Sequence, residues 1–289
     1  MEHLAARRRS GHRQQLDVQH ARGSEVAALA LALLLAAGPR QHLGPAPPAQ
    51  VRKVVTLAPS LSEIVLALGA GDRLAGVTRF DDDARTAQLP RIGGYNDPQP
   101  EAVLQLKPDL VLAEPAPANR GPVETLARLG VPVEAFPLSS VADIEEAIVG
   151  IGELLGLQAR GRELTRQIER ARAEARAQKR PRRRVLLVFG LEPLVVAGPR
   201  SFAGELLEDA GAENAAGESA QPFLRMNAEA AVRARPEVIV LCGVEPPAGR
   251  PIVPGLEKAR LTTLRSTALL HPGPRLPEAL ADLQAAIGQ

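Results

Sequence analysis

Short apolar runs, separated by glycine, proline and charged residues, recur along most of this chain. Several are rich in β-branched residues and are predicted to be strands: residues 52–57, 74–78, 110–113, 131–136 and 182–189. Helical patterns lie between them. Strands that alternate with helices predict an α/β fold with largely parallel sheets, whose ligand contacts lie in loops at the strand ends.

One segment of the chain occurs twice, 128 residues apart. Residues 100–112 read PEAVLQLKPDLVL and residues 228–240 read AEAAVRARPEVIV, so that Glu101 corresponds to Glu229. Each copy predicts a short helix with an acid in its first turn, a basic residue near its end, a proline that stops it, and an apolar strand. Repeats so far apart predict two similar lobes rather than a solenoid, whose period is about 20–50 residues.

A long helical stretch lies between the two copies. Residues 140–179 lack proline and carry apolar residues at helical spacing, and Ser140 with Asp143 is suited to cap the start. Glycines 150, 152 and 156 weaken the first half, so the stretch is either one connecting helix or two. The predicted division is an export segment and linker (1–49), an N-terminal lobe (50–138), a connecting helix (139–180) and a C-terminal lobe (181–289).

The first helix of the N-terminal lobe has a recognisable start signal. Ser60-Leu61-Ser62-Glu63 fits a capping box, which predicts a helix that runs to Gly69 and a structural role for Glu63.

The N-terminus has the pattern of an export signal. Residues 26–37 read VAALALALLLAA, follow several arginines and precede Gly38 and Pro39. This run is shorter than the roughly 20 residues that cross a bilayer as a helix, but it fits the apolar core of a signal peptide. We expect a periplasmic protein, cleaved after Ala37 or near Ala49, with no cysteine placed for a lipid anchor. The alternative is a buried helix of the folded domain.

Charge and reactive residues narrow the function. The formal charge is +2, but beyond residue 49 the chain carries 29 basic and 30 acidic residues, which gives no reason to expect a nucleic-acid partner. Only His271 and Cys242 remain there as histidine and cysteine, so a resident metal or cofactor is not expected, and Cys242 is predicted to be a buried thiol. The acids at 81–83 are typical of a solvated turn rather than a calcium loop.

Three segments carry a resemblance to a known family. VVTLAPSLSEIVLALGAGDRLAGVTRF (54–80), LPRIGGYNDPQPEAVLQLKPDLVLA (89–113) and HPGPRL (271–276) resemble the periplasmic vitamin B12-binding proteins of ABC importers, within the wider group that binds ferric siderophores, haem and cobalamin. The likeness extends from about residue 51 to the C-terminus and is weaker after Gly243. It implies two α/β lobes joined by a stiff helix, as in class III periplasmic binding proteins, with the ligand held in the cleft between them.

The resemblance also implies roles for particular residues. In this family one glutamate on each lobe docks onto arginines of the dimeric membrane permease, and the matching residues are Glu101 and Glu229, which also head the two repeat copies. Aromatic side chains line the cleft against the corrin, and Phe80, Tyr95 and Phe223 are at similar positions. This chain has no tryptophan where the family carries it, and Val195 replaces a second-lobe aromatic. The alternatives are acids that only start helices and aromatics that only pack their own loops.

Other ligands and other classes of protein remain open from the sequence. A ferric siderophore would require arginines in the cleft, for which Arg79, Arg225 and Arg275 are candidates, and haem would require an axial Tyr95 or His271. An α/β enzyme is disfavoured because no nucleophile elbow, Walker loop, dinucleotide fingerprint, H-E-x-x-H or C-x-x-C motif is present. A binding module that serves a sensor instead of a permease is the third alternative.

Overall fold

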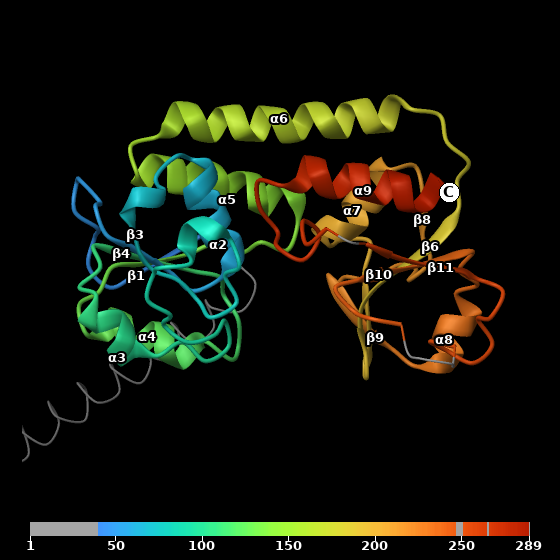
Figure 1. The fold of residues 1–289 in the computed structure, drawn as a ribbon, viewed down its shortest axis with the longest axis horizontal. Helices are drawn as coiled ribbons and strands as arrows, with labels where there is room; N and C mark the ends of the chain where they lie inside the picture. The colour runs from blue at the N-terminus through green and yellow to red at the C-terminus, as the bar shows by residue number, and fades with distance from the viewer. Residues whose placement is uncertain (1–39, 247–250, 265, 289) are drawn as a thin grey trace, which may run out of the picture.

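The computed structural model describes residues 40–246, 251–264 and 266–288, which form two α/β lobes beneath a long helix (Figure 1). The predicted two-lobed α/β architecture is confirmed. The apolar run at 26–37, predicted to be an export signal, lies outside the described residues. Within the described ranges, no helix is both long and apolar enough to cross a membrane.

The first lobe is built on a five-stranded sheet in the order β1-β5-β4-β2-β3. Strands β2 to β5 pair in parallel, and β1 runs antiparallel to β5. All four predicted strands of this lobe are found. Its elements are β1 (Gln41–Leu43), β2 (Val54–Thr56), α2 (Pro59–Ala67), β3 (Leu74–Gly76), α3 (Pro100–Gln105), β4 (Leu110–Ala113), α4 (Arg120–Arg128) and β5 (Val133–Ala135), with 3-10 turns at Gly71–Arg73 and Ala84–Thr86.

Strand β1 corrects the extent of the predicted linker. It lies within residues 1–49, which the sequence assigned to an export segment and linker, yet it pairs with β5 and buries Leu43. The buried carboxylate of Glu134 accepts a hydrogen bond from Arg40 Nε at 2.8 Å and contacts His42 Nδ1 at 2.9 Å. The segment QHL carries a single apolar residue, so it lacks the apolar run that marks the other strands of this lobe, and only tertiary pairing reveals it.

The predicted capping box at Ser60 is wrong. Helix α2 begins at Pro59 after Ala58, and no side chain caps it, so Ser60 and Glu63 both lie inside the helix. Proline is favoured at the first helical position, where its missing N–H is not needed, and this preference decides the start. Glu63 is thereby free to make contacts outside its own helix.

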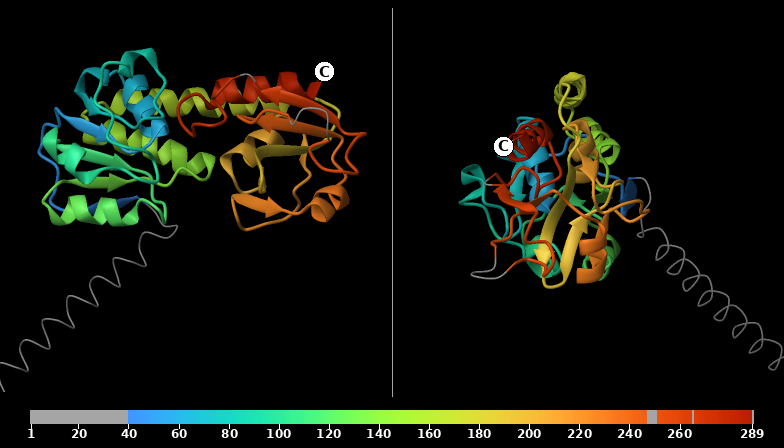
Figure 2. Two further views of the ribbon diagram at one scale, coloured as in Figure 1. Left: turned by 60° about the horizontal axis from the view of Figure 1, so that its bottom comes forward. Right: turned by 90° about the vertical axis from the view of Figure 1, so that its right-hand side faces the viewer.

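The connecting segment consists of two helices, the second of the two arrangements left open by the sequence. Helix α5 (Val141–Leu154) starts with the predicted capping box, in which the Asp143 amide donates to Ser140 Oγ at 3.1 Å and the Ser140 amide donates to Asp143 Oδ2 at 2.9 Å. The break follows at Gly156, whose φ of +70° favours glycine. Helix α6 (Gln158–Ala177) then runs along the outside of both lobes (Figures 1 and 2).

The second lobe has a mixed sheet in the order β11-β10-β6-β7-β9, with β8 also paired to β6. Strands β6, β8, β10 and β11 pair in parallel, whereas β7 and β9 are antiparallel, so the predicted largely parallel sheet holds for only part of this lobe. The short turn between β6 and β7 requires antiparallel pairing. The elements are β6 (Arg184–Leu191), β7 (Leu194–Ala197), α7 (Phe202–Asp209), β8 (Glu213–Asn214), β9 (Phe223–Met226), α8 (Ala228–Arg233), β10 (Val238–Cys242), β11 (Arg260–Leu264) and α9 (Leu276–Gly288).

The sequence repeat is also a repeat of backbone geometry. Lys107 and Arg235, which correspond in the two copies, have φ of +50° and +46°, and they alone among the described non-glycine residues have positive φ. The acid two residues later has the same role in each lobe: Asp109 accepts the Arg52 amide at 2.8 Å and Glu237 accepts the Arg184 amide at 3.2 Å. The two lobes therefore share a structural unit of helix, turn and strand.

A single apolar core joins the lobes on the side of α6. Its buried side chains come from α2 and α5 in one lobe and from α7 and α9 in the other. The Phe202 amide donates to the Ser139 carbonyl at 2.7 Å, and Arg176 on α6 pairs with the buried Asp209 at 2.8 Å. Because apolar packing and ion pairs both cross the junction, we expect the lobes to keep their relative orientation.

Candidate functional site

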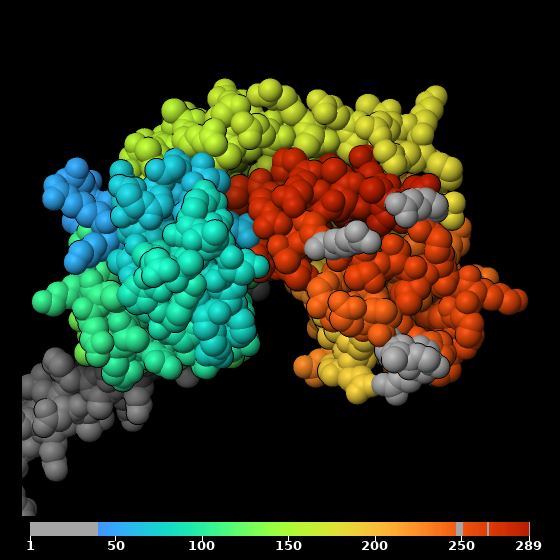
Figure 3. All heavy atoms as spheres, viewed as in Figure 1, coloured from blue at the N-terminus to red at the C-terminus, as the bar shows by residue number. Residues whose placement is uncertain are grey.

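A cavity of about 470 Å³ lies between the two lobes. The space-filling view shows the hollow between them on the side away from α6 (Figure 3). The first lobe contributes the start of α2, the loop at Tyr95 and residues 114–117 after β4, and the second contributes β6, α7, β9 and the segment 269–272. Loops that follow strands thus line the cavity, as expected for α/β sheets.

Aromatic rings form most of the second-lobe wall. Phe223 packs edge-on against Phe189 at 5.2 Å between ring centroids and against Phe202 at 6.5 Å. Tyr95 lies in the wall of the first lobe. Of the three aromatics singled out from the sequence, the structure therefore brings Tyr95 and Phe223 to one cavity. Such walls suit a broad apolar ligand, because rigid rings bury a large area with little loss of side-chain entropy.

Phe80, the third predicted aromatic, does not line this cavity. The residue is 54% exposed, and the Arg79 guanidinium lies 4.9 Å from the centroid of its ring. Arg79 is held by two hydrogen bonds to Asp97 at 2.8 and 3.0 Å. Phe80 therefore lies at the surface of the first lobe, against an arginine that Asp97 holds in place.

Glu114 is the acid of the cavity wall. It directly follows β4 and lines the cavity beside Tyr95 and three residues of a proline-rich loop. Desolvation raises the pKa of Glu114 to about 7, and burial, with the Glu114 carboxylate nearby, raises the pKa of Tyr95. The site therefore contains a carboxyl group that changes charge near neutral pH.

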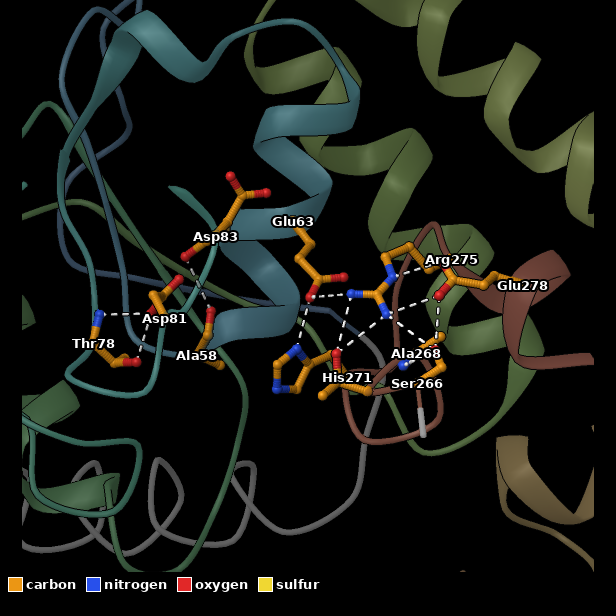
Figure 4. Close-up of polar contacts among 12 residues, drawn as sticks. Ala58, Glu63, Thr78, Asp81, Asp83, Ser266, Ala268, His271, Arg275 and Glu278 are labelled. Atoms are coloured by element: carbon orange, nitrogen blue, oxygen red, sulfur yellow. Dashed lines mark hydrogen bonds and ion pairs between the residues drawn. The ribbon is translucent and has the colours of Figure 1, made fainter. Parts of the chain in front are cut away.

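A second polar group lies where the segment before α9 meets α2 (Figure 4). His271 Nδ1 lies 2.7 Å from Glu63 Oε1, and Arg275 lies 3.5 Å from the same oxygen. The hydrogen bond to Glu63 raises the pKa of His271, because it stabilises the imidazolium. Glu63, predicted from the sequence to have a structural role, thus joins the lobes at the edge of the cavity.

The arginines proposed for an anionic ligand do not line the cavity. Among the described lining residues there is no lysine or arginine, and the ionisable ones are Tyr95, Glu114 and His271. The Arg275 guanidinium forms ion pairs with Glu63 and Glu278 and donates a hydrogen bond to the Thr267 hydroxyl. Arg79 and Arg275 thus form ion pairs with acidic side chains, and none of the three candidate arginines lines the cavity.

Two acids of the turn at 81–83 bond to residues of their own loop. Asp81 Oδ2 accepts from the amide and the hydroxyl of Thr78 at 2.9 and 2.6 Å (Figure 4), and Asp83 pairs with Arg85. In the described part of the chain no group of three or more histidine, cysteine or acidic side chains is arranged to hold a metal ion. Cys242 is buried within β10, as predicted.

The repeated glutamates occupy equivalent places. Glu101 is the second residue of α3 and Glu229 the second residue of α8, and both side chains are exposed. Figure 1 shows α3 and α8 at the same edge of the molecule, one on each lobe, opposite α6. Glu229 also pairs with Arg233 one turn later, at 2.6 Å.

Three aromatic or acidic residues of the cavity wall, Phe189, Phe202 and Glu114, were not singled out as site residues from the sequence. Phe189 and Glu114 lie at or after the end of a predicted strand, so the rule that ligands contact strand ends would have found them. Phe202 lies on a helix, and no local signal marks its position. His271, named from the sequence only as a candidate haem ligand, reaches the cavity because its segment crosses to the first lobe.

Comparison with known proteins agrees with this architecture. The profile of the family described as Periplasmic binding protein matches residues 54–246. A vitamin B12-binding protein of Yersinia pestis (strain Pestoides F) is 28% identical over 203 residues, which cover 68% of this chain and 72% of that protein. A periplasmic haem-binding protein of Pseudomonas aeruginosa has a TM-score of 0.68 at 29% identity, covering 82% of this chain and 93% of that one. The periplasmic vitamin B12 binding protein BtuF of Vibrio cholerae shares the fold, with a TM-score of 0.69 at 21% identity over 83% and 98% of the two chains.

Proposed function

This chain belongs to the periplasmic binding protein family, and we propose that it captures cobalamin or a related corrinoid in the cleft between its lobes and delivers it to an ABC importer. Proteins of this family bind solutes and are not enzymes. The observation that carries the choice of ligand is the cavity wall, which combines aromatic rings with an acid and, among the described residues, has no lysine or arginine. A corrin is broad and apolar on its faces and carries neutral carboxamides at its edge, so it needs no cationic partner.

Haem is the second candidate, because a haem-binding protein is among the similar structures. Tyr95 and His271 both line the cavity and are residue types that ligate haem iron. Against haem, its two propionates would enter a wall that carries Glu114 and, among the described residues, no lysine or arginine. A ferric siderophore with net negative charge meets the same difficulty.

Equilibrium titration tests the ligand directly. The purified protein is titrated with cyanocobalamin, hemin and a ferric catecholate siderophore, with quenching of Tyr95 fluorescence or calorimetry as the readout. We expect cyanocobalamin to bind with a Kd below about 10 μM, which corresponds to roughly 7 kcal/mol, and the two anionic ligands to bind more weakly. A tighter complex with hemin would replace the corrinoid assignment by haem.

Delivery is proposed to use Glu101 and Glu229. Both carboxylates are exposed at helix N-termini, where the helix dipole favours an acid, and they lie one per lobe along one edge. Two separated anions suit a two-fold symmetric permease that presents basic side chains. Replacing both glutamates by alanine should abolish corrinoid uptake by cells and leave the Kd unchanged, whereas preserved uptake would remove these residues from the docking surface.

A further inference from the structure

Glu114 is an acid that the cavity leaves without a partner. Its backbone carbonyl accepts Asn119 Nδ2 at 2.9 Å, but within the described residues its side chain makes no hydrogen bond or ion pair. It follows β4 and faces a space lined mostly by proline, leucine and phenylalanine. Glu114 is partly buried, so a ligand that fills the cavity removes its remaining solvent, and a hydrogen bond from that ligand offsets the free energy lost.

The other polar groups of the wall do not neutralise Glu114. Tyr95 is uncharged at neutral pH, and His271 is bound through Nδ1 to Glu63 at 2.7 Å. The described wall has no lysine or arginine. A second carboxylate placed here would therefore meet an acid with, among the described residues, no lysine or arginine beside it, and the one histidine of the wall is already paired with Glu63.

A carboxamide complements Glu114 in both of its protonation states. The pKa of about 7 that burial gives Glu114 means that both states occur near neutral pH. The ionised form accepts a hydrogen bond from the amide N–H, and the protonated form also donates one to the amide C=O. A carboxylate on the ligand can pair only with the protonated form, so it binds at the cost of taking up a proton.

We propose that Glu114 determines specificity by bonding to a carboxamide at the corrin edge and by rejecting macrocycles that carry carboxylates there. This inference rests on the corrinoid ligand proposed above and adds the residue that distinguishes the groups at the edge of the ring. The discrimination is between two forms of one macrocycle, so shape and apolar area cancel in the comparison.

Two corrins with the same macrocycle and different groups at its edge provide the test. Dicyanocobinamide carries carboxamides around the ring, and dicyanocobyrinic acid carries carboxylates at the same positions. Both are titrated at pH 8 into the wild-type protein, into Glu114→Gln and into the control Glu218→Gln. Glu218 is an exposed residue in the loop after β8, outside the cavity. Thermal unfolding of each variant checks that it is folded.

We expect the wild type and Glu218→Gln to prefer the carboxamide corrin by about tenfold or more, because at pH 8 a ligand carboxylate is repelled by ionised Glu114 or binds only with uptake of a proton. Glu114→Gln keeps the shape and still accepts an N–H, so its affinity for the carboxamide corrin should change by less than about threefold. Its affinity for the carboxylate corrin should rise by about tenfold. An unchanged ratio of the two Kd values in Glu114→Gln overturns the role of Glu114 and leaves the proposed function intact. Failure of the wild type to bind either corrin removes the proposed function and this inference with it.

Discussion

The raised pKa of Glu114 makes the stability of the protein depend on pH in a way that one substitution should abolish. The carboxyl group has a pKa of about 7 in the folded protein, against an ordinary glutamate value of 4.5 that applies to the unfolded chain. The folded state therefore holds a proton between these two values when the unfolded state has lost it. Stability must fall as pH rises through this window, because the native state binds more protons there.

The magnitude follows from the difference between the two pKa values. A difference of about 2.5 pH units at about 1.36 kcal/mol each gives a penalty of about 3 kcal/mol above pH 7, and almost none below pH 4.5. Glu114→Gln removes the charge and keeps the shape, so it should raise the free energy of unfolding by up to that amount at pH 8 and leave it unchanged at pH 4.5.

Urea denaturation followed by circular dichroism at pH 4.5, 6, 7 and 8 measures this difference. The control is Glu218→Gln, which removes a carboxylate from an exposed loop and should shift all four midpoints equally or not at all. If the curves for the wild type and Glu114→Gln run parallel from pH 4.5 to 8, Glu114 is not desolvated, and the argument from its buried charge fails.

Two further predictions concern the contacts that hold the lobes and their first strand. The hydrogen bond to Glu63 raises the pKa of His271, so the stability that this contact gives the protein should be complete below about pH 6.5 and decline as pH rises through the raised pKa. The difference in Tm between the wild type and His271→Gln should therefore become smaller as pH rises. A difference that grows with pH would contradict this prediction. A chain that begins at residue 50 lacks β1 and should be less stable for two reasons. Loss of the buried Leu43 side chain should lower the free energy of unfolding by about 1.5–3 kcal/mol. Loss of Arg40 and His42, which leaves the buried Glu134 carboxylate without its partners, should lower it by about 3–5 kcal/mol. Its urea midpoint should lie well below that of a chain that begins at residue 40, and equal midpoints would show that β1 contributes nothing.

Local patterns were sufficient to predict the architecture. Apolar runs located β2 to β5 of the first lobe and β6 of the second, and the repeated segment predicted two lobes. The capping box at Ser140 was also readable, because it depends on residues three positions apart. The one at Ser60 was misread because Pro59 competes for the same helix start, and a single sequence does not show which signal prevails.

The contents of the cavity depended on contacts between distant residues. Tyr95 and Phe223 could be singled out as loop aromatics, but Phe80 looks the same in sequence and lies exposed beneath Arg79. Glu63 and His271 are 208 residues apart, and Glu134 meets Arg40 across 94 residues. No local pattern encodes such pairs, because each partner is chosen by how the sheets and helices pack.

The amino-acid sequence therefore determined the elements, their repetition and the class of fold, since these follow from the spacing of apolar residues and from turn chemistry along a few neighbouring positions. Only the tertiary structure decided which side chains line the cavity, which arginines form ion pairs with acids, and which acid of the cavity has no partner among the described residues. The charge and burial of a site depend on residues that are distant in the chain and adjacent in the fold, and for that reason the raised pKa of Glu114, unlike its place after a strand, became visible only in three dimensions.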